Sequence, residues 1–213
     1  MSNLERRSLE IKELRIHEPA VEGELPTLEG YASVFDSWSE ELGGIEPFRE
    51  KVVRGAFSES IEQDDIRALF NHSPDFVLGR NKTGTLTLTE DERGLKVTIK
   101  PPDTRWAKDL LISVKRGDIS QMSFGFVCQK DSWSYDDSVD VRELHKVKLF
   151  DVSIVTYPAY PATECDVRAM VRSRIEERAV AAKELDAKKQ QEAAEAAKQK
   201  QEKFNQFKEI FLT

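Results

Sequence analysis

The sequence predicts an α+β fold with a mainly β, barrel-like core and a few helices, followed by a long C-terminal helical tail. Short runs in which apolar and polar residues alternate recur as far as residue 161, and glycine and proline separate them. One segment, 103–117, has helical apolar spacing instead. Residues 168–213 contain neither glycine nor proline and are rich in Ala, Glu, Lys and Gln. We therefore expect one domain at 1–165 and a charged helical or partly disordered extension at 166–213.

The N-terminal part of the domain reads as strands. Apolar residues in 9–16 predict an opening strand with a break in its register, and a second strand is expected at 28–35. Residues 45–53 can extend that second strand, and a short helix can follow Gly55. The clearest β signal is a hairpin at 86–99, whose two alternating runs pair across its centre.

The middle of the chain predicts one longer helix and then three strands. Asp103 or Thr104 can cap the helix, Gly117 is placed to end it, and one face is apolar, consisting of Trp106, Leu110, Leu111 and Val114. Strands are expected at 122–127, 139–144 and 147–156. The last of these is almost continuously apolar, which is typical of a strand in the centre of a sheet.

The tail has two readings. Val171, Ile175 and Val180 form a thin apolar stripe before a polar run, and the chain then closes with four apolar residues at helical spacing, Phe204, Phe207, Ile210 and Phe211. A long helix with an apolar end fits this pattern. The alternative is a disordered extension, because charge is high and complexity is low.

Composition limits the classes of function. The formal net charge is -7 and the pI is near 5.2, with no clustered basic residues, which argues against nucleic-acid binding. No apolar run approaches the roughly 20 residues that cross a bilayer, and no apolar leader follows Met1, so we expect a soluble, unsecreted protein without a membrane partner. Cys128 and Cys165 are too few for a disulfide framework or a zinc cluster, and we assign them no function.

His72 is the most suggestive of the three histidines, because it lies where an apolar strand runs into a polar turn that ends at Pro74. Strand ends present side chains on a rigid scaffold. Imidazole is the usual general base near neutral pH. A turn histidine is also common as a surface or hydrogen-bonding residue, so the position alone leaves both readings open.

Ser123 is a small hydroxyl residue among large apolar ones, directly before Phe124-Gly125-Phe126. It can be a nucleophile, with Gly125 allowing a substrate backbone to approach, or a core serine bonded to the backbone. Ser120 is its neighbouring competitor. Period-2 alternation places Ser120 and Ser123 on opposite faces, so only one of them can face a given pocket.

Asp151 interrupts the apolar run at 149–159. An isolated buried carboxylate is destabilising unless it is paired, so Asp151 needs a partner, which a histidine would supply. An acid that orients an imidazole is the third member of a serine-protease triad. The alternative is an aspartate that caps a helix or bonds to the backbone.

These motifs, taken in order, resemble those of the prohead proteases of tailed bacteriophages, a family related to the herpesvirus assemblin proteases. The similarity is spread over much of residues 29–162. It is carried by Glu29–Phe35, Val53–Phe57, Phe70–His72, Leu78–Arg80, Thr85–Leu86, Gly94–Val97, Met122–Phe126 and Asp151–Ala159.

The resemblance implies a herpesvirus-protease-like fold in which His72 is the base and Ser123 the nucleophile, with the third member in the strand that begins at Leu149. We choose Asp151 for that role, because it is the one predicted to be buried. His145 is the rival, since the herpesvirus relatives use a second histidine. Those relatives also place arginines near the oxyanion, and residues 157–163 contain none, so backbone N–H groups near Ser123 or in 157–161 would have to serve.

The function implied is that of a serine endopeptidase of phage head maturation that needs no metal or cofactor. Its substrates would be the scaffolding segment of the major capsid protein, other internal proteins of the prohead and the protease itself, and it would act inside the immature head in the host cytoplasm. The enzyme could form homo-oligomers, and its tail could dock it in the shell. Two other readings are a non-enzymatic scaffolding protein and a small-ligand β-barrel binder.

Overall fold

The computed structural model describes residues 4–9, 14–19, 23, 25–42, 47–136 and 139–157, and in the C-terminal part 175–177, 179–180, 183 and 187–191. The chain divides into two units, Met1–Asp166 and Val167–Thr213. All strands among the described residues lie in the first unit. Most of the predicted tail, including its apolar end at 204–211, lies outside the described residues, so its structure stays a prediction.

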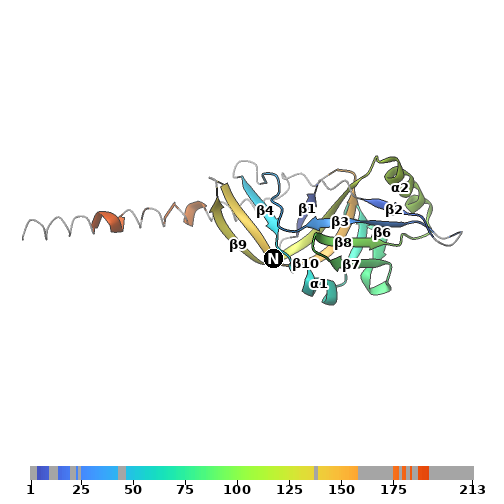
Figure 1. The fold of residues 1–213 in the computed structure, drawn as a ribbon, viewed down its shortest axis with the longest axis horizontal. Coiled ribbons are helices and arrows are strands. Elements are labelled where there is room, and N and C mark those ends of the chain that lie inside the picture. The colour runs from blue at the N-terminus through green and yellow to red at the C-terminus, as the bar shows by residue number, and fades with distance from the viewer. Residues whose placement is uncertain are drawn as a thin grey trace, which may run out of the picture. The chain divides into compact units, whose positions relative to one another are not determined.

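Strands dominate the first unit and form two sheets (Figure 1). The α+β prediction with few helices is therefore confirmed, but the predicted barrel is wrong. Because β1 and β6 remain as edges of one sheet and β2 and β7 as edges of the other, the strands that the structure describes do not close on themselves. The six-stranded sheet has the order β1 (Glu5–Leu9), β9 (Gln121–Asp136), β10 (Val139–Val155), β5 (Arg67–Phe70) and β6 (Ser73–Arg80), with β4 (Phe48–Val52) also on β10. The four-stranded sheet has the order β2 (Arg15–His17), β3 (Thr27–Val34), β8 (Gly94–Ile99) and β7 (Leu86–Glu90).

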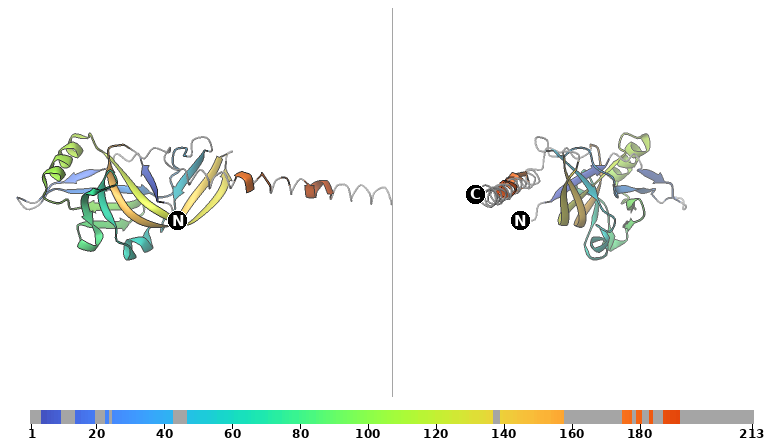
Figure 2. Two further views of the ribbon diagram at one scale, coloured as in Figure 1. Left: turned by 180° about the vertical axis from the view of Figure 1, so that it is seen from behind. Right: turned by 60° about the vertical axis from the view of Figure 1, so that its left-hand side comes forward.

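The long hairpin of β9 and β10 forms the middle of the six-stranded sheet, with β1 beside β9 and with β4 and β5 beside β10 (Figure 2). β10 is central, as its apolar run predicts, because it pairs with β9 antiparallel and with both β4 and β5 in parallel. The sequence pattern predicted two strands, at 139–144 and 147–156, where the structure has the single strand β10. The predicted gap coincides with two shifts in the register of β10 against β9, one between Leu144 and Lys146 and the other between Lys146 and Val147. Such bulges break the alternation from which strands are predicted.

The N-terminal strands pair differently from the prediction. The expected opening strand is two strands, and β1 pairs with β9 whereas β2 pairs with β3 in the other sheet. Likewise β4 does not lengthen β3 but runs parallel to β10. Alternation in the sequence reports that a segment is extended, but it carries no information about which strand lies beside it.

The helices α1 and α2 of the first unit form where helices were expected. α1 (Ser58–Gln63) follows Gly55, and a single 3₁₀ turn, η1 (Asn81–Thr83), joins β6 to β7. α2 (Arg105–Arg116) begins at Thr104, whose Oγ1 accepts a hydrogen bond from the Ala107 N–H, and ends at Gly117 in the left-handed conformation. Its buried face consists of Ala107, Leu110, Leu111 and Val114.

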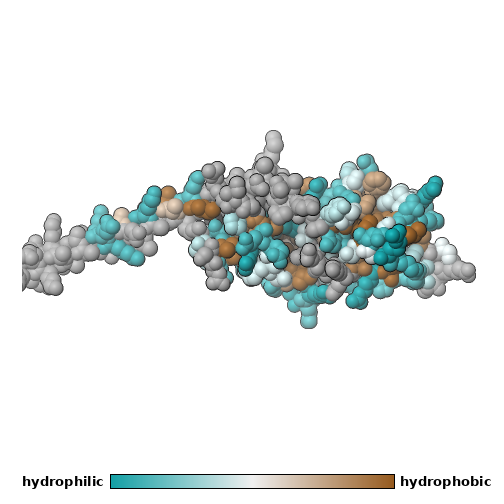
Figure 3. Space-filling model, turned by 90° about the horizontal axis from the view of Figure 1, so that it is seen from above, coloured by the Kyte–Doolittle hydropathy of each residue, from teal (hydrophilic) through white to brown (hydrophobic). Residues whose placement is uncertain are grey.

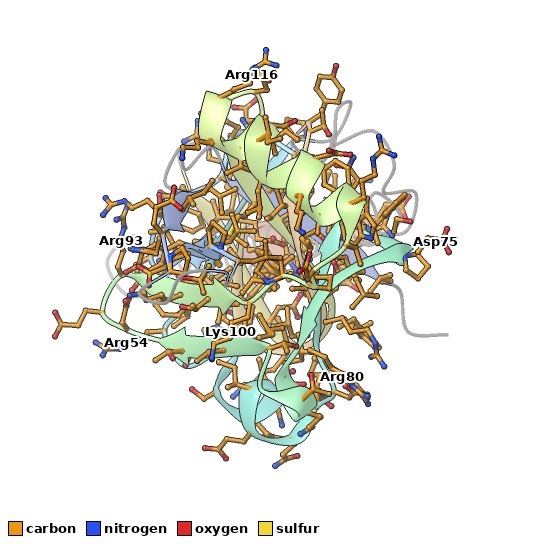
Figure 4. All side chains as sticks on the ribbon, turned by 90° about the vertical axis from the view of Figure 1, so that its right-hand side faces the viewer. Arg54, Asp75, Arg80, Arg93, Lys100 and Arg116 are labelled. Atoms are coloured by element: carbon orange, nitrogen blue, oxygen red, sulfur yellow. The ribbon has the colours of Figure 1, made fainter. Side chains whose placement is uncertain are left out.

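Side chains from both sheets and from α2 form one apolar core, and Ile61 of α1 packs against it. Phe124 packs edge-on against Phe57 and is stacked on Phe126, with ring centroids 5.3 and 5.1 Å apart. Polar and charged residues cover most of the described surface seen in Figure 3, with apolar residues showing between them. The charged side chains labelled in Figure 4 all point outward. The start of β9 differs, because Met122 to Phe126 are all buried, on both faces of the strand.

Candidate active site

His72 lies in the two-residue turn between β5 and β6, where Phe70 pairs with Ser73. Asn71 and His72 both have positive φ, 52° and 56°, which is the geometry of a type I′ hairpin turn. Asparagine and histidine are both enriched among non-glycine residues with positive φ, but for either residue this conformation costs free energy relative to negative φ. A strained residue persists only where its surroundings hold it, so the contacts of the turn matter.

Three side chains hold the turn against the end of β10. The Asn71 N–H donates to the Ile154 carbonyl at 2.9 Å. The Asn71 side chain exchanges hydrogen bonds with Thr156, donating to its hydroxyl at 3.1 Å and accepting from its N–H at 2.9 Å. The His72 N–H donates to Ser153 Oγ at 3.2 Å. These contacts fix the imidazole relative to β10.

Ser123 is the third residue of β9 and has no exposed surface. Its neighbours Met122 and Phe124 belong to the apolar core, so alternation turns Ser123 to the opposite face of the sheet. There it is flanked by Ser8 of β1 on one side and Ser153 of β10 on the other. Ser120, its competitor in the sequence, lies before the strand begins.

Asp151 reaches the same face of the sheet through a bulge. The pairing of β9 with β10 shifts between Leu149 and Asp151, leaving Phe150 as an extra, exposed residue. Asp151 then stands opposite Gly125. A Cβ atom on Gly125 would lie 2.3 Å from Asp151 Oδ2, so only glycine leaves room for the carboxylate.

The three side chains form one hydrogen-bonded series. His72 Nδ1 lies 2.7 Å from Asp151 Oδ1, and His72 Nε2 lies 2.8 Å from Ser123 Oγ. Because a carboxylate only accepts hydrogen bonds, Nδ1 carries the hydrogen, and Nε2 of the neutral ring is left with its lone pair toward Ser123. Only 8% of the His72 side chain and 10% of the Asp151 side chain are exposed. This arrangement can remove a proton from a serine hydroxyl.

His145, the alternative third member, lies elsewhere. It belongs to the outer part of β10, beyond the register shift at Lys146, and its Nε2 lies 2.8 Å from Ser132 Oγ and 3.7 Å from Glu143. The structure therefore brings Asp151, and not His145, against the imidazole of His72.

A comparison with protein families adds independent information. The model of the caudovirus prohead serine proteases matches residues 12–178. The chain belongs to this family. Comparisons with curated proteins and with solved structures gave no match. The residue pattern of the sequence and the family model thus agree on a prohead serine protease, and the described residues contain no helix long and apolar enough to span a membrane.

Two residues of this candidate site were not singled out from the sequence. Ser153 Oγ donates to Asp151 Oδ1 at 2.6 Å and accepts from the His72 N–H, so it links the acid to the backbone of the base. Asn71 holds the turn in place through its hydrogen bonds to Ile154 and Thr156. Period-2 spacing from Asp151 could have indicated Ser153, and the preference of asparagine for positive φ could have indicated Asn71.

Two further predictions concern the surroundings of the site. Of the segment expected to supply oxyanion donors, 157–161, only Tyr157 lies within the described residues, so the identity of the donors stays a prediction. Cys128 lies further along β9 than Ser123, and burial raises the pKa of its thiol to about 11. A thiol with such a pKa is protonated at neutral pH and makes a poor nucleophile.

Proposed function

We propose that this chain is a serine endopeptidase of phage head maturation in which His72, Ser123 and Asp151 are the catalytic residues. The observation that carries the proposal is the position of His72, whose two ring nitrogens contact a carboxylate on one side and a buried serine hydroxyl on the other. Membership of the prohead serine protease family supports the same reaction.

The reaction is acyl transfer. His72 Nε2 takes the Ser123 proton while Oγ attacks the peptide carbonyl, and Asp151 stabilises the imidazolium that forms. The imidazolium then gives its proton to the leaving amine, which leaves an acyl-enzyme on Ser123. Water hydrolyses this ester, with His72 again acting as the base. The proton transfers in these steps use His72, Ser123, the leaving amine and water.

The proposed substrates are the scaffolding segment of the major capsid protein, other internal proteins of the prohead and the protease itself. They are argued from the family, since a prohead protease works on what surrounds it in the immature head, in the host cytoplasm. The C-terminal segment 166–213 is then a candidate for docking the enzyme in the shell and for removal by its own cleavage.

Intact masses test this proposal. The concentrated chain and its Ser123→Ala variant are followed over time, and we expect fragments in the unchanged chain alone, with cuts between the β domain and the tail. A fluorophosphonate probe that labels the unchanged chain, but neither Ser123→Ala nor His72→Ala, would support the same roles. Labelling that survives in Ser123→Ala would contradict them.

A scaffolding protein is the second candidate, and the Ala-, Glu- and Lys-rich composition of 166–213 favours it. In that case Ser123→Ala would leave both prohead assembly and every polypeptide mass in the particle unchanged. The protease proposal requires instead that assembly proceeds and processing stops.

A further inference from the structure

The strand β1 lies where a substrate peptide would be expected. It is the edge strand of the six-stranded sheet and pairs antiparallel with β9, from Glu5 opposite Phe126 to Leu9 opposite Met122. Ser123 is in the middle of this pairing, opposite Ser8. On the other side of Ser123 the neighbouring strand is β10, so the only in-sheet position beside the nucleophile is the one that β1 fills.

Ser123 also contacts the backbone of β1 directly. Its Oγ donates a hydrogen bond to the Arg7 carbonyl at 2.8 Å, the same distance at which it meets His72 Nε2. A hydroxyl has one hydrogen, and the Arg7 carbonyl can only accept it. While that hydrogen points to Arg7, it is not available to the imidazole. The peptide carbonyl of β1 therefore competes with the general base for the proton of the nucleophile.

Charged side chains contribute to the attachment of β1. Among the β1 side chains whose burial the structure describes, Glu5 and Arg7 are buried, and both take part in a buried ion cluster. Arg7 Nε donates to Glu50 Oε1 at 2.7 Å, and Arg142 Nη1 donates to Glu5 Oε2 at 2.7 Å and to Glu50 Oε2 at 2.9 Å.

Glu50 and Arg142 belong to β4 and β10, which pair with each other and not through β1. Burial alone would lower the pKa of Arg142, but the charges of Glu50 and Glu5 raise it above its ordinary value, so the guanidinium stays charged. A peptide that replaces β1 must supply a basic group to pair with Glu50 and an acidic group to pair with Arg142. The matching peptide has an acidic residue two positions before a basic one, as Glu5 precedes Arg7.

We propose that the edge of β9 beside Ser123 binds substrate peptide as an added strand, and that β1 is the chain's own occupant of this surface, which substrate must displace. The proposal rests on the proposed function and adds to it the form of the substrate, an extended peptide with acidic and basic residues at i and i+2. Strand addition to an exposed sheet edge is a general mode of peptide recognition, in which main-chain hydrogen bonds supply affinity and side-chain pockets supply specificity.

The first test removes β1. A variant without residues 1–9 should be labelled at Ser123 by a fluorophosphonate at least about ten times faster than the full chain. In the full chain only the small fraction of molecules in which β1 has left β9 can react, whereas in the variant every molecule can. A synthetic peptide of residues 1–9 should slow the labelling again in a saturable way. A control peptide with Glu5→Lys and Arg7→Glu should not. Equal labelling of the two chains, or no competition by the peptide, would overturn the proposal.

A second test leaves β1 in place, in case the shortened chain does not fold. Leu9 and Met122 are directly paired, so Leu9→Cys with Met122→Cys, in a background without the native cysteines, allows a disulfide between β1 and β9. Oxidation should suppress labelling and reduction should restore it. The matched control is Thr87→Cys with Thr98→Cys across β7 and β8, where oxidation should change nothing. A labelling rate that is the same in oxidised and reduced β1–β9 protein would contradict displacement.

Failure of the proposed function would look different. If no form of the chain is labelled, catalysis by Ser123 is in question. The surface is then tested by the fluorescence anisotropy of the 1–9 peptide on the shortened Ser123→Ala chain. Saturable binding of this peptide, and not of the charge-swapped one, supports the strand-addition surface without any chemistry, whereas no binding overturns it.

Discussion

The inner and outer halves of the β9–β10 hairpin are built from the same two strands but differ in what they bury. The inner half runs from Gln121 to Cys128 in β9 and from Val147 to Val155 in β10. Around Ser123 and Gly125, side chains on both faces of β9 are buried. The outer half is more exposed, and its buried polar residue is Arg142, which is fully enclosed and contacts Glu5, Glu50 and Asp131.

The difference shows that a polar residue can be buried for two purposes. In the outer half, opposite charges pair with one another and hold strands together, so their removal should be seen in stability. In the inner half the polar side chains form a directed series from acid to base to hydroxyl, so their removal should be seen in rate. The predictions below separate these two outcomes.

Asp151→Asn should cause the largest change. The new amide can donate a hydrogen bond to His72 Nδ1, which favours the tautomer that carries its hydrogen on Nε2. That nitrogen then cannot accept the Ser123 proton, and kcat should fall by about 10,000-fold. The rate of self-cleavage measures this fall. The melting temperature should change little, and a variant that keeps its full rate would remove Asp151 from the mechanism.

Arg142→Met should give the largest loss of stability, about 3–5 kcal/mol in the free energy of unfolding, because Glu5 and Glu50 then share only Arg7 as buried countercharge. Urea denaturation measures it. The matched control is Arg49→Met in β4, whose ion pair with Glu41 is exposed and should contribute little. Equal effects of the two changes would mean that the buried cluster has no special role.

Gly125→Ala should lower the rate while leaving the chain folded. The new methyl group would stand 2.3 Å from Asp151 Oδ2 and would push the carboxylate from His72, and a displacement of this order costs roughly 100-fold in rate. Gly84→Ala is the control, since φ there is +72° and a Cβ would meet nothing within 4 Å. That change should reduce the melting temperature and leave the rate unchanged.

Ser153→Ala should have a smaller effect on rate, roughly tenfold, because it removes one hydrogen bond to Asp151 and one from the His72 N–H. The loss should appear in kcat and not in KM, since Ser153 is a positioning residue. Ser153→Thr keeps the hydroxyl and should recover most of the rate. A loss confined to KM would assign Ser153 to substrate binding instead.

His145→Gln should have the smallest effect of all. His145 contacts Ser132 and Glu143 on the outer half, so neither self-cleavage nor urea stability should change measurably. A loss of self-cleavage with intact folding would reverse the choice between Asp151 and His145.

Local features of the fold could be predicted from the sequence, whereas pairing could not. The 86–99 hairpin and the helix between Thr104 and Gly117 follow from alternation and capping, which act over a few residues. The edge position of β1 and the parallel pairing of β4 with β10 depend on contacts between distant segments, which alternation does not encode.

The site divides in the same way. The need for a buried partner predicts that Asp151 meets a histidine, and the structure brings it to His72. The bulge at Phe150 and the positive φ of His72 have no signature in the sequence, because each is imposed by the strand beside it. The contact between Ser123 and the Arg7 carbonyl likewise depends on how β1 pairs.

The central position of β10 has a consequence for the time at which activity can first arise. Of the strands that the structure describes, β10 is the last to be synthesised and supplies Asp151, yet the segments of β4 and β5 that pair with it leave the ribosome 92 and 84 residues earlier (140 − 48 and 151 − 67). Pairings so far apart in the chain close late and slowly during folding. A nascent chain that ends before β10 carries both His72 and Ser123 but lacks the acid and the strand that positions the base. Under the proposed mechanism, synthesis itself therefore delays proteolysis until β10 has been made.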